Sequence, residues 1–554
     1  MKIVIVGGVA AGASAATKAR RTDEHAQIIV FEKGSYMSFA NCGLPYYIGD
    51  YIKQREHLLV VSKELFKKRF NIDVKTDHEV IRIDRQNKRV QVKDLLTGSQ
   101  FYEDYDKLIL APGARPIRPD IENINLGNVF TLTTIPDVDK IKELLSKRQV
   151  REAVIVGGGY IGLETAEGLK NVGVNVTIIE LAEQIVPVFD IEMTVRVMDT
   201  MVKNGIDIIL GRKVVKLLGK HSVNLVQLDD GTSIPADLVL LTVGIKPNIE
   251  LAQQAGLKVG KGIIVDSRML TSDPDIYAAG DAVEINHLVT QKPYWIPLAG
   301  PANKQGRVAG ANAAGDNKVF KGAMGTSILK MFDMTLAKTG LSEKEAKAAG
   351  LDFGVSYTHS AHHAGYYPGS RMMTIKLIWE KGSNRLLGAQ IAGGEGVDKR
   401  IDVLAAAIYG GFTLFDLEQL DLAYAPPYSS AKDPVILAGF VAANIARDEV
   451  DIITPQQLKV ALNKGEAIDI IDVRTPGEYE AGHIKNARLI PLDEFRKHLD
   501  EFRKHLDGLD KNSSIVVYCG IGYRSYHALR ILKAHGFKNV KNLSGGYTSW
   551  KMVL

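Results

Sequence analysis

The chain has 554 residues, of which 45% are hydrophobic and 24% are charged, and its 69 Lys and Arg nearly balance its 64 Asp and Glu. This length exceeds what one hydrophobic core supports and indicates roughly three or four domains. The net charge of +5 is too small to favour nucleic-acid binding, and the first apolar run, which stops at Gly7, is too short for a signal peptide or a membrane span. Two cysteines exclude a disulfide scaffold, so we expect a cytoplasmic protein.

Two copies of one pattern, a strand followed by a glycine loop, a helix, a second strand and an acid, occupy the first half of the chain. The first copy contains residues 2–6, Gly7, Gly8, Gly12 and Glu32, and the second contains residues 153–156, Gly157, Gly159, Gly162 and Glu180. Glycines in such a loop let the backbone approach a pyrophosphate, and the acid accepts ribose hydroxyls. Two dinucleotide sites are therefore predicted. The carboxylate of Glu180 favours NADH over NADPH at the second site.

Two further segments indicate which dinucleotide each site binds. A strand ends at Gly113 just before the second copy, and Gly280-Asp281 follows that copy. Over residues 1–445 this order resembles the flavoprotein disulfide reductases that bind two dinucleotides. The resemblance implies that FAD occupies the first site, that NADH or NADPH occupies the second, and that Asp281 holds the FAD ribityl chain.

Cys42 lies in a Ser-x-x-x-Cys-Gly-x-Pro-Tyr segment that begins at Ser38. Well-known members of the family use a cysteine pair beside the flavin, but this segment offers one thiol. A lone thiol leaves three alternatives: a mixed disulfide with a small thiol, a sulfenic acid as in NADH peroxidases and oxidases, or an inert buried thiol. The related peroxidases carry a histidine in the first glycine loop, where this chain has Ala10. The mixed disulfide is therefore the favoured alternative.

The chain also resembles the coenzyme A disulfide reductases of this family. That resemblance implies CoA contacts from residues on several segments, which are Ser14, Lys18, Arg21, Ser38, Asn41, Asn303 and Lys432. It also implies a homodimer in which Tyr424 and either Tyr366 or Tyr367 reach Cys42 of the other subunit. A phenol there can donate a proton or a hydrogen bond to a departing CoA thiolate. Lys18 departs from the family pattern, in which other members have an amide.

The last hundred residues contain an apolar strand that ends at Cys519 and continues as Cys-x-x-Gly-x-Arg, with Arg524 in the last position. Together with Asp472-Val473-Arg474, Glu478 and Gly482-His483, this loop resembles a rhodanese, a sulfurtransferase module. Its amides suit an anionic persulfide on Cys519. We expect structural roles for Asp472, Arg474 and His483. The heptad of residues 493–499 is repeated at 500–506, which we interpret as a surface insertion.

These patterns predict an α/β protein with two Rossmann-like dinucleotide-binding domains, an α+β dimerisation domain and a C-terminal α/β rhodanese domain. The expected boundaries are 1–115 with 240–324 for FAD, 116–239 for NAD(P)H, 325–445 for dimerisation, 446–455 for a linker and 456–554 for the rhodanese.

The predicted activity is NAD(P)H-dependent, FAD-dependent reduction of CoA disulfide, CoA persulfide or polysulfide through Cys42, coupled to a rhodanese that carries sulfur on Cys519. An NADH oxidase or peroxidase that uses a Cys42 sulfenic acid, and a redox-sensing binding protein, remain as alternatives. We expect no metal, no nucleic acid and no membrane partner.

Overall fold

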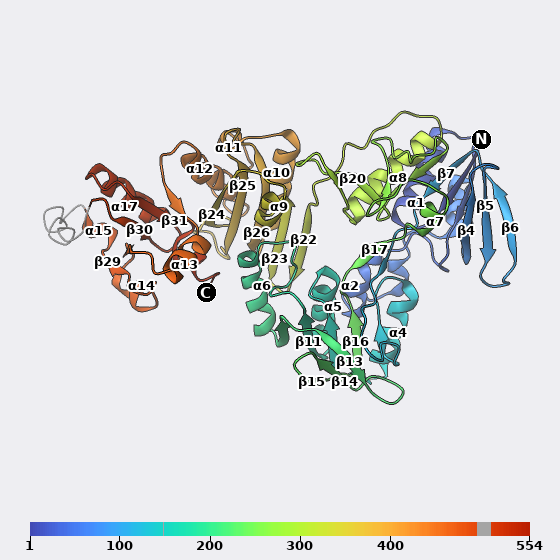
Figure 1. Ribbon diagram of the computed structural model, residues 1–554, viewed down its shortest axis with the longest axis horizontal. Helices are drawn as coiled ribbons and strands as arrows, with labels where there is room; N and C mark the ends of the chain where they lie inside the picture. The colour runs from blue at the N-terminus through green and yellow to red at the C-terminus, as the bar shows by residue number, and fades with distance from the viewer. Residues whose placement is uncertain (148, 496–510, 554) are drawn as a thin grey trace. The chain divides into compact units, whose positions relative to one another are not determined.

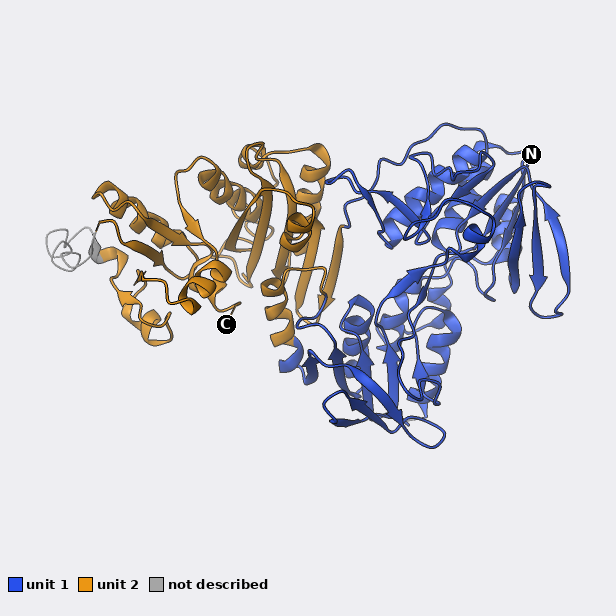
Figure 2. Ribbon diagram, in the orientation of Figure 1, with its two compact units in different colours: residues 1–186, 201–325 blue, residues 187–200, 326–554 orange. Residues whose placement is uncertain are grey.

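The computed structural model describes residues 1–147, 149–495 and 511–553, which form two compact units. The first contains residues 1–186 and 201–325, and the second contains residues 187–200 and 326–554 (Figure 2). The second copy of the repeated heptad lies outside the described residues. Among the described residues, no helix is long and apolar enough to cross a bilayer.

The first sheet of unit 1 is parallel because its apolar strands are joined by crossover segments (Figure 1). In spatial order its strands are β19 (Ile276–Ala278), β7 (Lys107–Leu110), β1 (Lys2–Val6), β2 (Gln27–Phe31) and β3 (Asp73–Lys75). Helix α1 (Ala10–Thr22) packs closely on α8 (Ala299–Ala313), because small residues line both helices. A Cβ added at Gly306 would lie 2.2 Å from the Ala11 carbonyl oxygen.

A second parallel sheet repeats this design. Its strands are β12 (Ile206–Leu210), β11 (Asn175–Glu180), β10 (Glu152–Val156), β16 (Leu238–Leu241) and β9 (Val129–Phe130), with helices α4 (Ile135–Ser146) and α5 (Tyr160–Asn171). An antiparallel sheet is inserted in the chain within each parallel one. Strands β4 (His78–Asp84), β5 (Arg89–Asp94) and β6 (Gln100–Asp104) lie between β3 and β7, and strands β13 (Val214–Leu218), β14 (Leu225–Leu228) and β15 (Ser233–Pro235) lie between β12 and β16. The remaining small strands are β8 (Ala114–Pro116) with β17 (Ile245–Pro247), and β18 (Ile263–Ile264), β20 (Val283–Asn286) and β21 (Pro293–Tyr294).

Short helices complete unit 1. They are α2 (Leu44–Ile48), α3 (Lys63–Phe70) and α7 (Glu250–Gln254), together with the 3-10 turns η1 (Asn41–Gly43) and η2 (Arg55–Leu58).

Unit 2 begins with a five-stranded antiparallel sheet. Its strands are β22 (Ser327–Met331), β23 (Met334–Gly340), β26 (Leu386–Gly393), β25 (Met372–Glu380) and β24 (Phe353–Ala361). Its helices are α9 (Glu343–Ala348), α10 (Val397–Gly410), α11 (Leu414–Glu418), α12 (Pro434–Ala446) and most of α6 (Ile191–Lys203). Strand β26 is buried along its whole length, so it forms the centre of this core.

A C-terminal parallel sheet completes unit 2. Its strands are β27 (Ile452–Ile453), β31 (Val540–Leu543), β30 (Ser514–Tyr518), β28 (Ile468–Asp472) and β29 (Arg488–Leu489). Its helices are α13 (Pro455–Asn463), α14 (Pro476–Glu480), α15 (Leu492–Phe495), α17 (Tyr523–Ala534) and α18 (Gly546–Trp550). Part of the segment expected as a linker is thus a strand, because Ile452 and Ile453 pair with Asn542 and Leu543 of β31.

Candidate functional site

The first glycine loop is shaped by backbone contacts that exclude side chains. Gly7 has a positive φ of 93°, and a Cβ there would lie 2.1 Å from the Ala111 carbonyl oxygen. The Gly8 N–H donates to Glu32 Oε2 at 2.6 Å, and the Gly34 N–H donates to Glu32 Oε1 at 2.7 Å. The loop thus holds the carboxylate of Glu32 at the end of β2. Loss of hydration raises the pKa of this carboxyl.

The second glycine loop has the same geometry. Gly157 has a φ of 108°, and a Cβ at Gly162 would lie 2.3 Å from the Gly157 carbonyl oxygen. The Gly158 N–H donates to Glu180 Oε2 at 2.6 Å, and Glu180 Oε1 accepts the Ala182 N–H at 2.9 Å. Gly159 is the N-cap of α5. In both copies the helix N-terminus has no side-chain cap, and an acid is fixed at the end of the next strand. This combination fits a dinucleotide.

Asp281 follows β19, which lies in the same sheet as β1. The preceding Gly280 has a φ of 87°, and its N–H donates to Gln305 Oε1 at 2.7 Å. Burial raises the pKa of Asp281 to about 6. Hydroxyl donors would favour its ionised form, so this carboxylate fits the ribityl chain of FAD. Gly113 turns the chain after β7 with a φ of 67°.

Cys42 lies in the η1 turn before α2 and is exposed. Its thiol is 3.6 Å from Asn41 Oδ1. The Ser38 N–H donates to the Gly8 carbonyl oxygen at 2.9 Å, so the cysteine segment is tied directly to the first glycine loop. Loss of hydration raises the pKa of the Cys42 thiol, and the Glu164 and Asp281 carboxylates raise it further. The raised pKa lowers the thiolate fraction of Cys42 at neutral pH.

A contact that the sequence patterns did not predict joins the cysteine segment to the second dinucleotide unit. Tyr46 on α2 donates to Glu164 Oε1 on α5 at 3.0 Å. Burial raises the pKa of Glu164, and this hydrogen bond opposes the rise. Glu164 follows the second glycine loop by a single helical turn, and its charge acts on the Cys42 thiol. The sequence pattern predicts that Glu164 lies on the helix after the second glycine loop. It does not predict the contact with Tyr46, because Tyr46 lies 118 residues away in the chain.

Cys519 follows β30 and is buried. Its sulfur accepts the Gly522 N–H at 3.2 Å and the Ser525 hydroxyl at 3.5 Å. Helix α18 holds the backbone of this loop, because the Tyr547 N–H donates to the Cys519 carbonyl oxygen at 2.7 Å. Donors that converge on one sulfur favour a thiolate or a persulfide anion.

Comparisons with known proteins agree with this geometry. Residues 1–306 match the family model "Pyridine nucleotide-disulphide oxidoreductase", residues 326–434 match its dimerisation domain, and residues 454–552 match the rhodanese-like domain. The chain belongs to the pyridine nucleotide-disulphide oxidoreductase family. The predicted fold class is thereby confirmed.

Several known proteins and solved structures are similar to this chain. A Pyrococcus abyssi protein named "NAD(P)H sulfur oxidoreductase (CoA-dependent)" is 41% identical over 438 residues, which is 78% of this chain and 96% of the relative. The structure of reduced Bacillus anthracis CoADR-RHD is 42% identical with a TM-score of 0.95, over 100% of this chain and 98% of that one. A structure named as an NAD-dependent persulfide reductase from A. fulgidus is 42% identical with a TM-score of 0.91, over 99% of this chain and 100% of that one.

Two of the residues predicted to bind CoA meet on neighbouring helices of this oxidoreductase fold. The Ser14 hydroxyl on α1 donates to Asn303 Oδ1 on α8 at 2.6 Å. Lys18 and Arg21 follow Ser14 at intervals of four and three residues, so the three side chains share one face of α1. Arg20 is different, because it is buried and donates to the carbonyl oxygens of Phe70 and Asn71.

The remaining predicted residues lie in unit 2. Tyr366 and Tyr424 form a hydrogen bond between their hydroxyls at 3.0 Å, and this bond raises the pKa of Tyr366. Tyr367 lies edge-on to the ring of His363 instead, with centroids 5.5 Å apart. Lys432 is exposed beside the buried Asp433. The structure therefore pairs two of the three predicted tyrosines.

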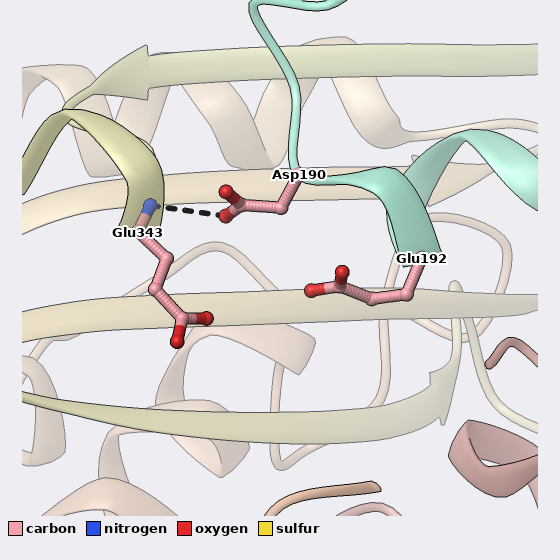
Figure 3. Close-up of side chains that lie close together, drawn as sticks. All are labelled: Asp190, Glu192 and Glu343. Carbon is pink, nitrogen blue, oxygen red and sulfur yellow. Dashed lines mark hydrogen bonds between the residues drawn. The ribbon is translucent and has the colours of Figure 1, made fainter. Parts of the chain in front are cut away.

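A buried ion network lies in unit 2, where Asp190, Glu192 and Glu343 converge (Figure 3). Three carboxylates could hold a metal ion, but the ammonium of Lys376 lies among them, at 2.8 Å from Asp190, 2.5 Å from Glu192 and 2.8 Å from Glu343. Burial opposes the charge on Lys376, but Tyr357 and the three carboxylates together hold its pKa well above the ordinary value. Residues 187–200, which were expected in the NAD(P)H domain, thus join unit 2 because Lys376 binds their acids.

Proposed function

We propose that this chain is a homodimeric oxidoreductase that uses NAD(P)H and FAD to reduce CoA disulfide, CoA persulfide or polysulfide through Cys42. Its C-terminal domain carries sulfane sulfur on Cys519. The observation that carries the proposal is the exposed, unpaired thiol of Cys42, which is tied to the first glycine loop in the unit that contains both dinucleotide loops. Two of the relatives are named NAD(P)H coenzyme A polysulfide/persulfide reductase and coenzyme A disulfide reductase. The Ser14, Lys18 and Arg21 face of α1 offers the charge that CoA phosphates require. Catalytic thiols need a reducing compartment, which favours the cytoplasm.

The proposed cofactor sites fit residues of both glycine units. Glu32 and Asp281 would hold FAD, and Glu180 would hold the ribose of the nicotinamide nucleotide. When bound, these two cofactors supply an electron pair to a disulfide at Cys42.

Cys42 performs the sulfur exchange. Its thiolate attacks one sulfur of CoA disulfide, a bond forms between Cys42 and that sulfur, and the other CoA leaves as a thiolate with the electron pair of the broken bond. Two-electron reduction of the mixed disulfide would break its S–S bond, restore the Cys42 thiolate and release the second CoA as a thiolate. The Tyr366 and Tyr424 hydroxyls would hydrogen-bond the leaving thiolate, which lowers the cost of its charge.

The experiment that tests this function replaces Cys42 by Ser in the full-length holoenzyme. NADH-dependent reduction of CoA disulfide should fall to background while the FAD absorption spectrum stays that of a bound flavin. Cys519→Ser is the matched control, and it should reduce preformed CoA disulfide at the wild-type rate. If Cys42→Ser keeps that rate, the proposal is wrong. If the wild-type protein turns over peroxide or oxygen faster than any CoA substrate, the oxidase or peroxidase alternative replaces it. Binding of NADH with no turnover of any acceptor would favour the redox sensor.

A further inference from the structure

The arginine of the Cys519 loop is already paired with an acid. Arg524 is the second residue of α17, and its guanidinium forms a two-pronged pair with Glu478, with Nη1 2.8 Å from Oε2 and Nη2 2.6 Å from Oε1. The pair lies over the loop, since a Cβ added to Gly520 would be 3.7 Å from Arg524 Nη2 and 3.8 Å from Glu478 Oε1. The positive charge that the loop offers to an incoming anion is therefore cancelled beside the reactive sulfur.

Glu478 is held in this position by its own helix. It is the third residue of α14, where the Thr475 N–H and the Thr475 hydroxyl both donate to its Oε2 at 3.0 Å. The Arg524 guanidinium lowers the pKa of Glu478 to about 2, so the carboxylate is ionised at neutral pH. An ionised acid held by these four hydrogen bonds does not leave the loop without losing them.

The exposed rim of the loop is apolar. Ile521 and Tyr523 expose 42% and 67% of their surfaces, although they lie two and four residues after Cys519. The Tyr523 ring is held edge-on by His527, with centroids 4.9 Å apart. An alkyl chain gains free energy by covering such a rim, whereas a sulfonate gains nothing from it.

From this geometry we propose that Glu478 determines the sulfur donor of the C-terminal domain: it rejects thiosulfate, a dianion, and leaves the loop selective for alkyl persulfides such as the pantetheine end of CoA persulfide. The inference rests on the proposed function of Cys519 as a sulfur carrier and names its substrate class. Selectivity of this kind comes from a repulsive group as much as from new attraction.

The transfer needs no external oxidant. The Cys519 thiolate attacks the outer sulfur of a persulfide R–S–SH, and a bond forms between Cys519 Sγ and that sulfur. The S–S bond of the donor breaks, R–S⁻ leaves with its electron pair, and the proton stays on the transferred sulfur. Gly522 N–H and Ser525 hydroxyl, which already point at Sγ, stabilise the negative charge of the attacking thiolate.

The test compares the wild-type holoenzyme with Glu478→Gln. Glutamine can still serve in the helix-capping arrangement, so the fold of α14 is kept while the negative charge is lost. Thiosulfate turnover is measured as sulfite release with dithiothreitol as acceptor, and persulfide transfer is measured with CoA persulfide by the mass added to Cys519. In Glu478→Gln we expect kcat/KM for thiosulfate to rise on the order of tenfold relative to kcat/KM for CoA persulfide. Most of this rise should come from a lower KM for thiosulfate.

Two variants show whether the gain has the proposed cause. Glu480→Gln removes an exposed acid from the same helix and should leave donor preference as in the wild type. Arg524→Gln added to Glu478→Gln should abolish the gain, because the freed guanidinium is what binds the sulfonate. The inference is overturned if CoA persulfide loads Cys519 in both proteins but Glu478→Gln gains no thiosulfate activity, or if the wild type prefers thiosulfate. If no donor loads Cys519 in any variant, the proposed carrier role fails, and the donor assignment fails with it.

Discussion

At the scale of single residues, the charge around Cys42 governs the availability of its thiolate. Glu164 and Asp281 both raise the pKa of this thiol in addition to the effect of lost hydration. A thiol with a raised pKa has a smaller thiolate fraction at neutral pH, and its reactivity increases as the pH rises through that pKa.

Replacing Glu164 by Gln removes one of these negative charges, so we expect the pKa of Cys42 to fall. The rate at which iodoacetamide alkylates Cys42 in the holoenzyme, measured from pH 6 to pH 10, should then rise at lower pH than in the wild type. Glu167→Gln is the matched control on the same helix and should leave the profile in place. A shift toward higher pH in Glu164→Gln would contradict this account of the site.

The basic residues of α1 make a separate prediction. Lys18 and Arg21 share a helix face with Ser14, which contacts Asn303. Because each exposed charge contributes up to about 1 kcal/mol to a contact with a phosphate, replacing both by Ala should raise KM for CoA disulfide about tenfold. Steady-state rates with inorganic polysulfide provide the control, because that substrate has no phosphate. Equal losses with both substrates would indicate damage to the fold or to the flavin site.

At the scale of elements, the two glycine loops are built alike, and each ends in an acid held by backbone N–H groups. At the second loop this arrangement fixes the Glu180 carboxylate where we propose that the ribose of the nucleotide binds. An NADPH 2′-phosphate would be repelled there, so kcat/KM should be higher for NADH than for NADPH. Glu180→Gln should shift that ratio toward NADPH by on the order of tenfold, while Glu183→Gln should not. Steady-state kinetics with both nucleotides test this directly.

These elements also show what the sequence could predict. The glycine loops, their acids and the Cys519 loop are local patterns, in which the spacing along one strand, turn and helix determines the geometry. The pairs formed by Tyr46 with Glu164, by Lys376 with Glu192 and by Arg524 with Glu478 join residues 118, 184 and 46 positions apart. No local spacing connects such partners, because the tertiary fold alone brings them together. The role of residues 187–200 in unit 2 was missed for the same reason.

At the scale of the whole molecule, strand β24 connects the C-terminal domain to the antiparallel sheet of unit 2. The Tyr357 N–H donates to Ser544 Oγ at 3.0 Å, and His359 Nε2 lies 2.7 Å from Ser549 Oγ. The segment that contains these serines also supports the Cys519 loop through the Tyr547 N–H. The C-terminal domain therefore contacts β24 through the same segment, residues 544–549, that holds the Cys519 loop.

His359 makes this contact sensitive to acid. The ring is buried, its Nδ1 lies 2.9 Å from Thr374 Oγ1, and loss of hydration lowers its pKa from 6.5 to about 3. The unfolded chain consequently binds a proton to this histidine at a higher pH than the folded protein does. The stability that neutral His359 provides is complete above about pH 6.5 and is lost progressively as the pH falls toward 3.

His359→Gln tests this effect, because an amide makes hydrogen bonds without titrating in this range. The Tm of each holoenzyme is measured at pH 7.5, 6.5, 5.5 and 4.5. The wild type should be the more stable protein at pH 7.5, and its advantage over His359→Gln should shrink as the pH falls. An advantage that stays constant across this range would show that the histidine does not take up a proton on unfolding, and that acid acts on the docked domain through other groups.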